Sequence, residues 1–185
     1  MKNKVKSIEE VENLVKMHKQ EGKIIVTTNG SFDLIHCAHI RLLQKSKEEG
    51  DVLIVLINSD ESIRRNKGPS RPIIPERERA LMVAALDCVD YVIVFNEDKP
   101  LRYLERIRGH VHIKGGTWDP VRLGEEKTFI DQWNGVYKTF ELEEGFSTTN
   151  IINEILNRHN ENYSPKLNDN IVPVKSQDKI SFSSS

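Results

Sequence analysis

The stretch "TNGSFDLIHCAH", residues 28–39, combines residue types that bind phosphate. An apolar run ends in Asn29-Gly30, and His36 and His39 then follow three residues apart at the start of a predicted helix. Residues at this spacing share one face of a helix. The first helical turn also offers unpaired backbone N–H groups and a partial positive charge. The stretch therefore predicts a compact set of hydrogen-bond donors for phosphate oxygens.

Two other interpretations of the histidine pair stay open. His36 and His39 are also zinc ligands by type, which would make this a metal-binding module. A third and a fourth ligand at suitable spacing are not evident, because Cys37 points away from the histidine face. The remaining alternative is a pair of surface or capping histidines.

A second candidate lies near the end of the chain, where "STTN" precedes an apolar-periodic segment, residues 149–159. Ser147, Thr148 or Thr149 is a natural N-cap for a helix that begins there. The same geometry would direct hydroxyls and free N–H groups at another set of phosphate oxygens.

A cluster of basic residues lies between these two candidates. Its members are Arg64, Arg65, Lys67, Arg71 and Arg79. Solvated surface charge is the ordinary interpretation. The intervening glycine and prolines also suit a loop that closes over a polyphosphate.

Strand-like and helix-like segments alternate around these candidates. The predicted strands are residues 23–28, 52–58, 91–95, 111–114 and 136–142, and the predicted helices lie within residues 1–23, 39–51, 75–89, 100–107 and 149–159. In the third helix, Leu81, Met82, Ala85 and Leu86 are expected on the buried face. This order predicts an α/β fold, a Rossmann-like doubly wound parallel five-stranded sheet with helices on both faces.

Each predicted strand is followed by an unusually polar segment. These segments are residues 28–33, 58–68, 95–100, 114–120 and 143–150. Any one of them alone reads as a connecting loop. In a doubly wound sheet, however, ligands bind beyond the carboxyl ends of the strands, so all five segments would meet at one rim. The dinucleotide fingerprint GxGxxG and the Walker loop are absent, which disfavours a dehydrogenase or a P-loop kinase.

Composition limits the partners and the compartment. The chain has 37% hydrophobic and 30% charged residues and a net charge of -1, so no overall field attracts nucleic acid or an anionic membrane. No segment approaches membrane-spanning length, and the charged N-terminus is unlike a signal peptide. Cys37 and Cys88 are isolated, which favours a reducing cytoplasm. We expect one domain over residues 1–158 and a disordered, serine-rich tail over 159–185.

Five separated motifs, taken together, resemble a known family. They are "TNGSFDLIHCAH", "INSDESIRRNKGPSRPI", "ERERALMVAALDCVDYVIVF", "KGG" and "EEGFSTTNII", in this order between residues 8 and 156. The chain resembles the nucleotidyltransferases of the cytidylyltransferase-like superfamily. Within it, the motifs are most similar to those of bacterial D-glycero-β-D-manno-heptose 1-phosphate adenylyltransferases, the ADP-heptose synthase domain of lipopolysaccharide or capsule precursor biosynthesis.

The resemblance implies transfer of AMP from ATP to a sugar 1-phosphate, giving an ADP-sugar and pyrophosphate, and a homodimer or larger homo-oligomer. It implies catalytic roles for His36, His39, Lys67 and Arg79. It implies nucleotide binding by Asn29, Gly30, Ser31, Phe32, Asp33, Lys114, Gly115, Gly116, Ser147, Thr148 and Thr149. Mg²⁺ would bridge the ATP phosphates, held largely by nucleotide and water with Asp33 nearby. Bacterial relatives often carry this domain behind a sugar kinase, for which we expect no room in 185 residues.

Several positions depart from the family patterns. Ala38 replaces the glycine of H-x-G-H, which we expect to be tolerated with some effect on nucleotide affinity. Thr117-Trp118 stands where the heptose enzymes more often have Asp-Tyr, so the acceptor could differ. Leu142-Glu143 replaces the Arg-Thr pair of the glycerol 3-phosphate cytidylyltransferases, which favours adenylyl transfer. The alternatives are a cytidylyltransferase for glycerol 3-phosphate or a similar small phosphate ester, and a non-catalytic nucleotide-binding protein.

Overall fold

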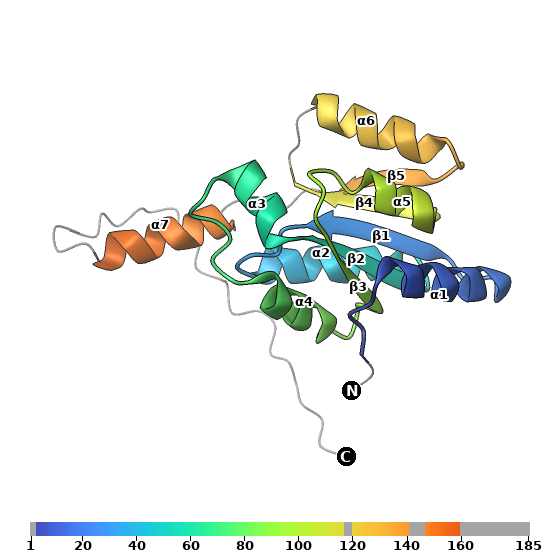
Figure 1. Ribbon diagram of the computed structural model, residues 1–185, viewed down its shortest axis with the longest axis horizontal. Helices are drawn as coiled ribbons and strands as arrows, with labels where there is room; N and C mark the ends of the chain where they lie inside the picture. Colours follow the sequence, from blue (N-terminus) through green and yellow to red (C-terminus); the bar gives the residue numbers. More distant parts are fainter. Residues whose placement is uncertain (1–2, 117–119, 141–146, 160–185) are drawn as a thin grey trace, which may run out of the picture. The chain divides into compact units, whose positions relative to one another are not determined.

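The computed structural model describes residues 3–116, 120–140 and 147–159 (Figure 1). By its internal contacts the chain divides into two units, Met1–Ile151 and Ile152–Ser185. The first unit contains the whole sheet. Of the second unit, the structure describes only the end of the last helix.

Some predictions fall on residues that are not described. The tail beyond residue 160, Thr117, Trp118, Leu142 and Glu143 all lie outside the described residues. The domain boundary at residue 158 therefore stays a prediction.

One five-stranded parallel sheet organises the first unit, in the order β3-β2-β1-β4-β5. Its strands are β1 (Ile25–Gly30), β2 (Val52–Asn58), β3 (Tyr91–Phe95), β4 (Val111–Gly115) and β5 (Val136–Phe140). Every residue of β2 is buried, as expected for an apolar, β-branched strand covered on both faces. The predicted parallel five-stranded sheet is confirmed.

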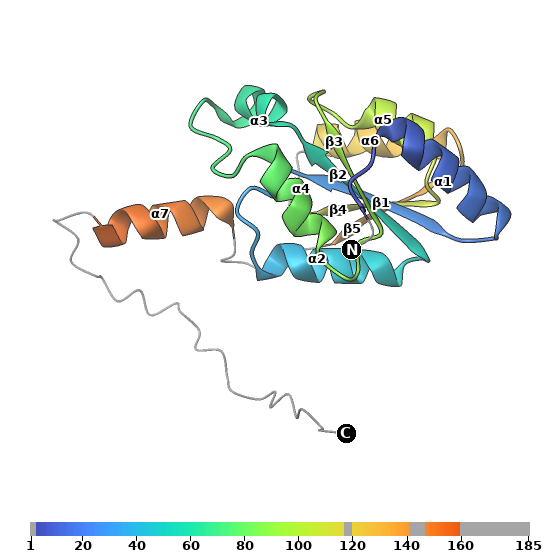
Figure 2. The same cartoon turned by 60° about the horizontal axis from the view of Figure 1, so that its bottom comes forward.

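Helices cover both faces of the sheet (Figure 2). The seven helices of the described residues are α1 (Ile8–Gln20), α2 (Cys37–Glu48), α3 (Asp60–Lys67), α4 (Glu76–Ala84), α5 (Leu101–Ile107), α6 (Pro120–Asp131) and α7 (Thr148–His159). In Figure 2, α2 and α4 lie on one side of the sheet and α1, α5 and α6 on the other. The doubly wound arrangement is confirmed.

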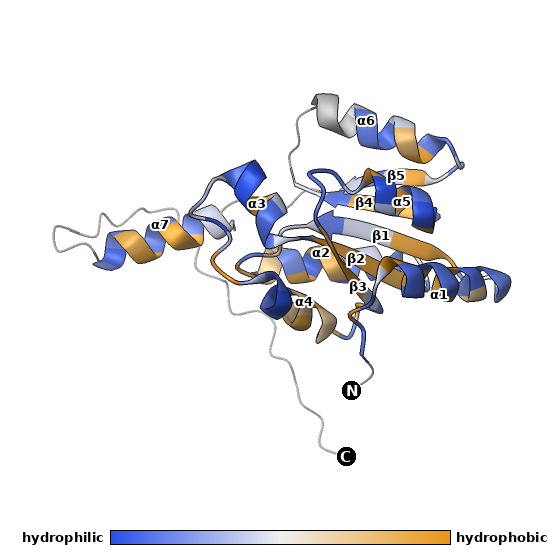
Figure 3. Cartoon of the chain, in the orientation of Figure 1, coloured by the Kyte–Doolittle hydropathy of each residue, from blue (hydrophilic) through white to orange (hydrophobic). Residues whose placement is uncertain are grey.

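Two hydrophobic clusters result, one on each face. Val26 packs in the cluster beneath α2 and α4, whereas its neighbour Ile25 packs in the cluster beneath α1, α5 and α6. This split follows from the two-residue period of a strand. The hydropathy colouring shows apolar strands at the centre and more polar outer helix surfaces (Figure 3). Along β1 the apolar colour fades toward the arrowhead, where the strand reaches Asn29 and Gly30.

Two helices lie where no helix was expected. The segment that forms α3 was interpreted as a loop, and no element was assigned to α6. Ser59 caps α3 by accepting a hydrogen bond from Ser62 N at 3.1 Å. Apolar periodicity missed this helix because Ile63 is its one buried hydrophobic residue. In α6, one of the buried positions is the charged residue Glu126, which likewise interrupts the apolar pattern.

The prediction of which face of α4 is buried is wrong. Leu81 is 52% exposed, whereas Arg79, Ala80 and Val83 are buried. The Arg79 side chain is anchored inside the protein, and of the other predicted residues Ala85 is exposed while Met82 and Leu86 are half-buried, Leu86 against the core. The helix also ends at Ala84, before the predicted end.

The sheet topology places the candidate site. Strand order reverses at β1, which pairs with β2 on one side and with β4 on the other. Ligands of doubly wound sheets bind at such a switch point, outside the carboxyl ends of the strands. Asn29-Gly30 ends β1 and Lys114-Gly115 ends β4, so both pairs lie at this point.

Candidate active site

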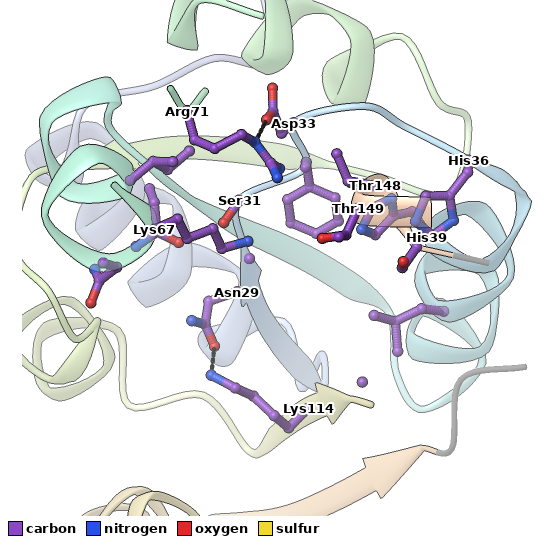
Figure 4. A pocket seen from close by; sticks show the side chains of 18 residues that line it. Asn29, Ser31, Asp33, His36, His39, Lys67, Arg71, Lys114, Thr148 and Thr149 are labelled. Carbon is purple, nitrogen blue, oxygen red and sulfur yellow. Dashed lines mark hydrogen bonds and ion pairs between the residues drawn. The ribbon is translucent and has the colours of Figure 1, made fainter. Parts of the chain in front are cut away.

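A pocket of about 340 Å³ opens at the switch point (Figure 4). It is lined by Asn29, Gly30, Ser31, Phe32, Asp33, His36, His39, Leu42, Asn58, Ile63, Asn66, Lys67, Arg71, Lys114, Gly115, Ser147, Thr148 and Thr149. The structure thus brings together residues from both ends of the chain, and all predicted site residues except Arg79 and Gly116 line the pocket. Gly116 lies one residue beyond the lining, and its N–H donates to Phe140 O at 3.0 Å.

The two histidines stack against each other at the start of α2. Their ring centroids are 3.9 Å apart with an interplanar angle of 28°. The Nδ1 atoms of both rings are buried and have no hydrogen-bond partner among the described residues. His36 occupies the N-cap position, yet its side chain makes no capping hydrogen bond. Both imidazoles are therefore available to a ligand in the pocket.

The Phe32 ring packs against the His39 ring. Its backbone is left-handed, with φ 47°, an uncommon conformation for a residue with a side chain. Its ring is buried, with its centroid 5.2 Å from that of His39. Phe32 thus packs against His39, and its predicted role in nucleotide binding stays a prediction.

Both histidines are neutral at pH 7. Burial lowers the pKa of His39 to about 4, and the nearby His36 and the positive charge of Lys67 add to this shift. Burial also lowers the pKa of His36. Neutral imidazoles can each donate one N–H hydrogen bond.

Asp33 holds the loop that carries Arg71. The carboxylate, 1% exposed, accepts hydrogen bonds from Arg71 Nε at 2.6 Å, Ile73 N at 2.8 Å and Ile74 N at 2.9 Å. Since a carboxylate has about four acceptor positions, most of them are filled by the protein. The structure therefore gives Asp33 a role in fixing the loop, and its predicted place near a magnesium ion stays a prediction.

Arg71 and Lys67 supply positive charge to the pocket. In Figure 4 both side chains lie on the side opposite the histidines and Thr149. The Nη2 atom of Arg71 is buried and has no hydrogen-bond partner among the described residues. Lys67 reaches the pocket from the last turn of α3. A bound anion would therefore meet donors from two sides.

The predicted phosphate contact of Arg79 is corrected. Its side chain is 0% exposed and does not line the pocket. The guanidinium donates to Ile74 O, Ser31 O, Asn58 O and Asp60 Oδ1 at 2.6–2.9 Å. Arg79 thus fixes the backbone around the pocket and is not directed at a ligand.

Two other arginines of the basic cluster, Arg64 and Arg65, also lie outside the pocket lining. Arg65 donates to Asp98 Oδ1 at 2.8 Å and to Asn96 O. Arg64 is exposed and does not line the pocket. Of the cluster defined from the sequence, only Lys67 and Arg71 line the pocket among the described residues.

Lys114 lies at the end of β4, buried beside the pocket. Its Nζ donates to Asn29 Oδ1 at 2.8 Å, as drawn in Figure 4, and to Glu126 Oε1 at 3.0 Å. Glu126 and its partner Tyr137 were not identified from the sequence, because neither belongs to a motif. Gly115 follows, so close to α2 that a Cβ there would lie 2.5 Å from Leu42 Cδ2.

The hydroxyl cluster forms the predicted N-cap and lies at the pocket, while its contact with phosphate stays a prediction. Ser147 caps α7, because its Oγ accepts from Asn150 N at 3.0 Å. Ser147, Thr148 and Thr149 also line the pocket. A hydroxyl that accepts one hydrogen bond can still donate another, so capping leaves the Ser147 proton available to a ligand.

Ala38, which replaces the motif glycine, is buried outside the pocket lining and is 2% exposed. Cys37 and Cys88 are free thiols. In residues 3–116, 120–140 and 147–159, no group of three or more His, Cys, Asp or Glu side chains could hold a metal ion. None of the described helices is long and apolar enough to span a membrane.

Chemically, the pocket is a site for a polyanion. Neutral imidazoles, an arginine, two lysines and several hydroxyls surround a cavity at the carboxyl end of a parallel sheet. Such donors stabilise negative charge on phosphoryl oxygens.

A family model and several known proteins are similar to this chain in sequence. The cytidylyltransferase-like family model matches residues 27–154. The bifunctional protein HldE of Syntrophotalea carbinolica is 43% identical over 157 residues, which cover 85% of this chain and 32% of that protein. HldE of Geobacter sulfurreducens is 45% identical over 160 residues, again 85% and 32% of the two chains. The chain therefore spans about a third of the length of these relatives.

A solved structure is also similar. The lipopolysaccharide core biosynthesis protein of Thermoplasma volcanium has a TM-score of 0.55 and 28% identity, covering 66% of this chain and 98% of that one. The matched family model covers the histidine pair, the sheet from Thr27 onward and the hydroxyl cluster at the start of α7. The chain belongs to the cytidylyltransferase-like family of nucleotidyltransferases.

Proposed function

We propose that this nucleotidyltransferase transfers AMP from ATP to a sugar 1-phosphate, D-glycero-D-manno-heptose 1-phosphate. The observation that carries the proposal is the buried, unpartnered Nδ1 atoms of His36 and His39 beside the cations of the pocket. The similarity to the HldE proteins supports the heptose acceptor, with this chain corresponding to their adenylyltransferase part. The cytoplasm, where ATP is available, is its proposed compartment, and self-association stays a prediction.

In the proposed reaction, an oxygen of the sugar 1-phosphate attacks the α-phosphorus of ATP. A new P–O bond forms there, the bond from the α-phosphorus to the α–β bridging oxygen breaks, and pyrophosphate leaves with the bond electrons. The attacking phosphate is already anionic near neutral pH, so no general base is needed. Catalysis then rests on positioning and on stabilisation of the charged oxygens.

The pocket residues fit these tasks. Neutral His36 and His39 would donate to the oxygens of the reacting phosphate, whereas Lys67 and Arg71 would hold the phosphates that leave. The hydroxyls of Ser147 and Thr149 would donate to the same group, whereas the Thr148 hydroxyl donates to Leu34 O at 3.4 Å in this structure. This assignment replaces Arg79 by Arg71.

Magnesium is part of the proposal as a companion of the nucleotide. When bound, it would neutralise charge on the phosphate oxygens. Asp33, the one carboxylate among the described residues that line the pocket, already accepts three hydrogen bonds. Such a site suits an ion held mainly by the nucleotide phosphates and water.

Pyrophosphate release tests the proposal. Purified protein with magnesium is given ATP or CTP together with a heptose 1-phosphate, glycerol 3-phosphate or phosphoethanolamine. We expect release with ATP and the heptose 1-phosphate, reduced on the order of a hundredfold in His36→Ala because one donor is lost. His159→Ala, at the exposed end of α7, is the matched control and should keep full activity.

Other outcomes would redirect the assignment. A preference for CTP with glycerol 3-phosphate would show a cytidylyltransferase. ATP binding without pyrophosphate release from any acceptor would contradict the proposal and favour a non-catalytic nucleotide-binding protein.

A further inference from the structure

A buried ion pair lies directly beside the pocket. Lys114 Nζ is 3.0 Å from Glu126 Oε1, and the two side chains are 1% and 0% exposed. Lys114 lines the pocket, whereas Glu126 lies behind it on α6. A charged ammonium is costly to bury unless it is paired and hydrogen-bonded. Glu126 is thus positioned to stabilise the charge of Lys114 at the edge of a ligand site.

The carboxylate is itself held in place. The hydroxyl of Tyr137, on β5, donates to Glu126 Oε2 at 3.0 Å, so both carboxylate oxygens are engaged. The Lys114 ammonium also donates to Asn29 Oδ1 at 2.8 Å, at the end of β1. Three elements, α6, β5 and β1, therefore determine together where this ammonium lies.

In the described part of the chain, several other groups surround Lys114. Lys114 faces Glu126 from α6, Tyr137 from β5 and His112 from its own strand. His112 is fully buried, and burial together with the charge of Lys114 lowers its pKa to about 3, so it is neutral at pH 7. Across the pocket lie His39, also neutral at pH 7, and the cation Lys67. Of these groups, Glu126 is the carboxylate that forms an ion pair with the Lys114 ammonium.

We propose that Glu126 is a positioning residue that keeps the Lys114 ammonium protonated and directed at the phosphate chain of the bound nucleotide, with Tyr137 fixing the carboxylate. This inference rests on the proposed function, because it takes a nucleoside triphosphate as the ligand. Glu126 does not touch the ligand and acts through Lys114. Without its carboxylate, burial would favour the neutral amine, which donates weakly to phosphate.

The test compares two neighbouring glutamates of α6. Glu126→Gln removes the buried charge, and the control Glu125→Gln removes a half-exposed one that pairs with Lys99 at the surface. ATP binding is measured by calorimetry at pH 6 and pH 9. We expect Glu126→Gln to bind ATP on the order of tenfold more weakly than wild type at pH 9, with a smaller difference at pH 6. Glu125→Gln should match wild type at both pH values.

If Glu126 had no positioning role, its replacement would change ATP affinity in the opposite direction. If Glu126 merely offsets positive charge, its removal tightens ATP binding. Equal or tighter binding by Glu126→Gln at pH 9 would therefore overturn the inference. In a Lys114→Met background, Glu126→Gln should cause no further weakening, because a residue that acts through Lys114 has nothing left to position.

A second variant keeps the test decisive if Glu126→Gln does not fold. Tyr137→Phe removes one hydrogen bond to Glu126 and keeps the charge, so we expect a smaller loss of ATP affinity in the same direction. Wild-type affinity in Tyr137→Phe at pH 9, together with an unfolded Glu126→Gln, would also reject the inference.

The outcomes separate the two proposals. The expected binding pattern without pyrophosphate release would reject the transfer reaction and support the role of Glu126. Pyrophosphate release by wild type, with Glu126→Gln unaffected at both pH values, would reject only the role of Glu126. Failure of wild type to bind ATP would overturn both proposals.

Discussion

Two arginines of the same basic cluster have different tasks, and hydrogen bonding distinguishes them. Arg79 donates to four protein oxygens and is fully buried. Arg71 lines the pocket and donates from Nε to the Asp33 carboxylate. Its Nη2 atom is buried and has no hydrogen-bond partner among the described residues. An arginine near a phosphate site is thus a ligand-binding candidate only when the protein leaves one of its donors unused.

A conservative substitution tests the structural role of Arg79. Arg79→Lys cannot reach all the acceptors of the guanidinium, and each buried acceptor left unpaired costs about 1–3 kcal/mol. We expect the free energy of unfolding, measured with urea, to fall by about 3 kcal/mol. Arg77→Lys, exposed on the same helix, should be neutral. Unchanged stability of Arg79→Lys with weakened ATP binding would instead restore the phosphate contact that was first predicted.

At the scale of elements, α3 and α4 support each other's first turns. The backbone N–H of Asp60 donates to Glu76 Oε2, and the N–H of Glu76 donates to Asp60 Oδ1, both at 2.8 Å. Each carboxylate thus satisfies a donor at the start of the other helix. Together with Asp33, which binds residues 71–74, this exchange anchors both ends and the middle of the segment that carries Arg71.

The exchange is open to a direct test. Glu76→Ala leaves the N–H of Asp60 without its acceptor, and we expect the free energy of unfolding to fall by about 1 kcal/mol, as for loss of an N-cap. Glu78→Ala, an exposed change in the same first turn, is the control and should have little effect. Equal effects of the two variants in urea unfolding would show that helix propensity or dipole effects explain the loss, and not the exchange.

At the scale of the whole molecule, buried neutral histidines link folding to pH. Burial lowers the pKa of His39 to about 4 and, with the charge of Lys114, that of His112 to about 3. In the unfolded chain both would titrate near pH 6.5. Between these values the unfolded state binds more protons, so acid favours unfolding.

Stability should therefore rise with pH across this window. The contribution of the two neutral histidines to the free energy of unfolding is fully present above about pH 6.5. It is lost progressively as the pH falls toward about 3, and it amounts to on the order of 3 kcal/mol for each histidine. Urea unfolding from pH 7 to pH 4 measures this slope. His112→Asn removes one titrating group and should flatten it, whereas His159→Asn, an exposed change, should not. The same slope in His112→Asn as in wild type would contradict this account.

Much of the fold could be predicted from the sequence because it depends on local patterns. Uninterrupted β-branched runs such as residues 52–58 mark buried parallel strands, and polar segments after them mark the rim where a ligand binds. The helix at Asp60–Lys67 could not be found in this way, because its stability comes from caps and charges with one buried apolar side chain. The spacing of His36 and His39 predicted their shared position because it is set within a single helical turn.

Only the tertiary structure decided which charged side chains face the ligand. The roles of Arg79, Asp33 and Glu126 depend on partners from distant parts of the chain. Asp33, for example, accepts from Arg71, and the Lys114 partner of Glu126 also donates to Asn29, 85 residues away in sequence. A charge becomes structural when folding surrounds it with acceptors or counter-charges, and stays available when folding leaves a donor open to the pocket. By itself the sequence determined the strands and the polar motifs that follow them, because these are set by neighbouring residues. Burial and pairing of charges are set by contacts between distant segments, and these exist only in the folded protein.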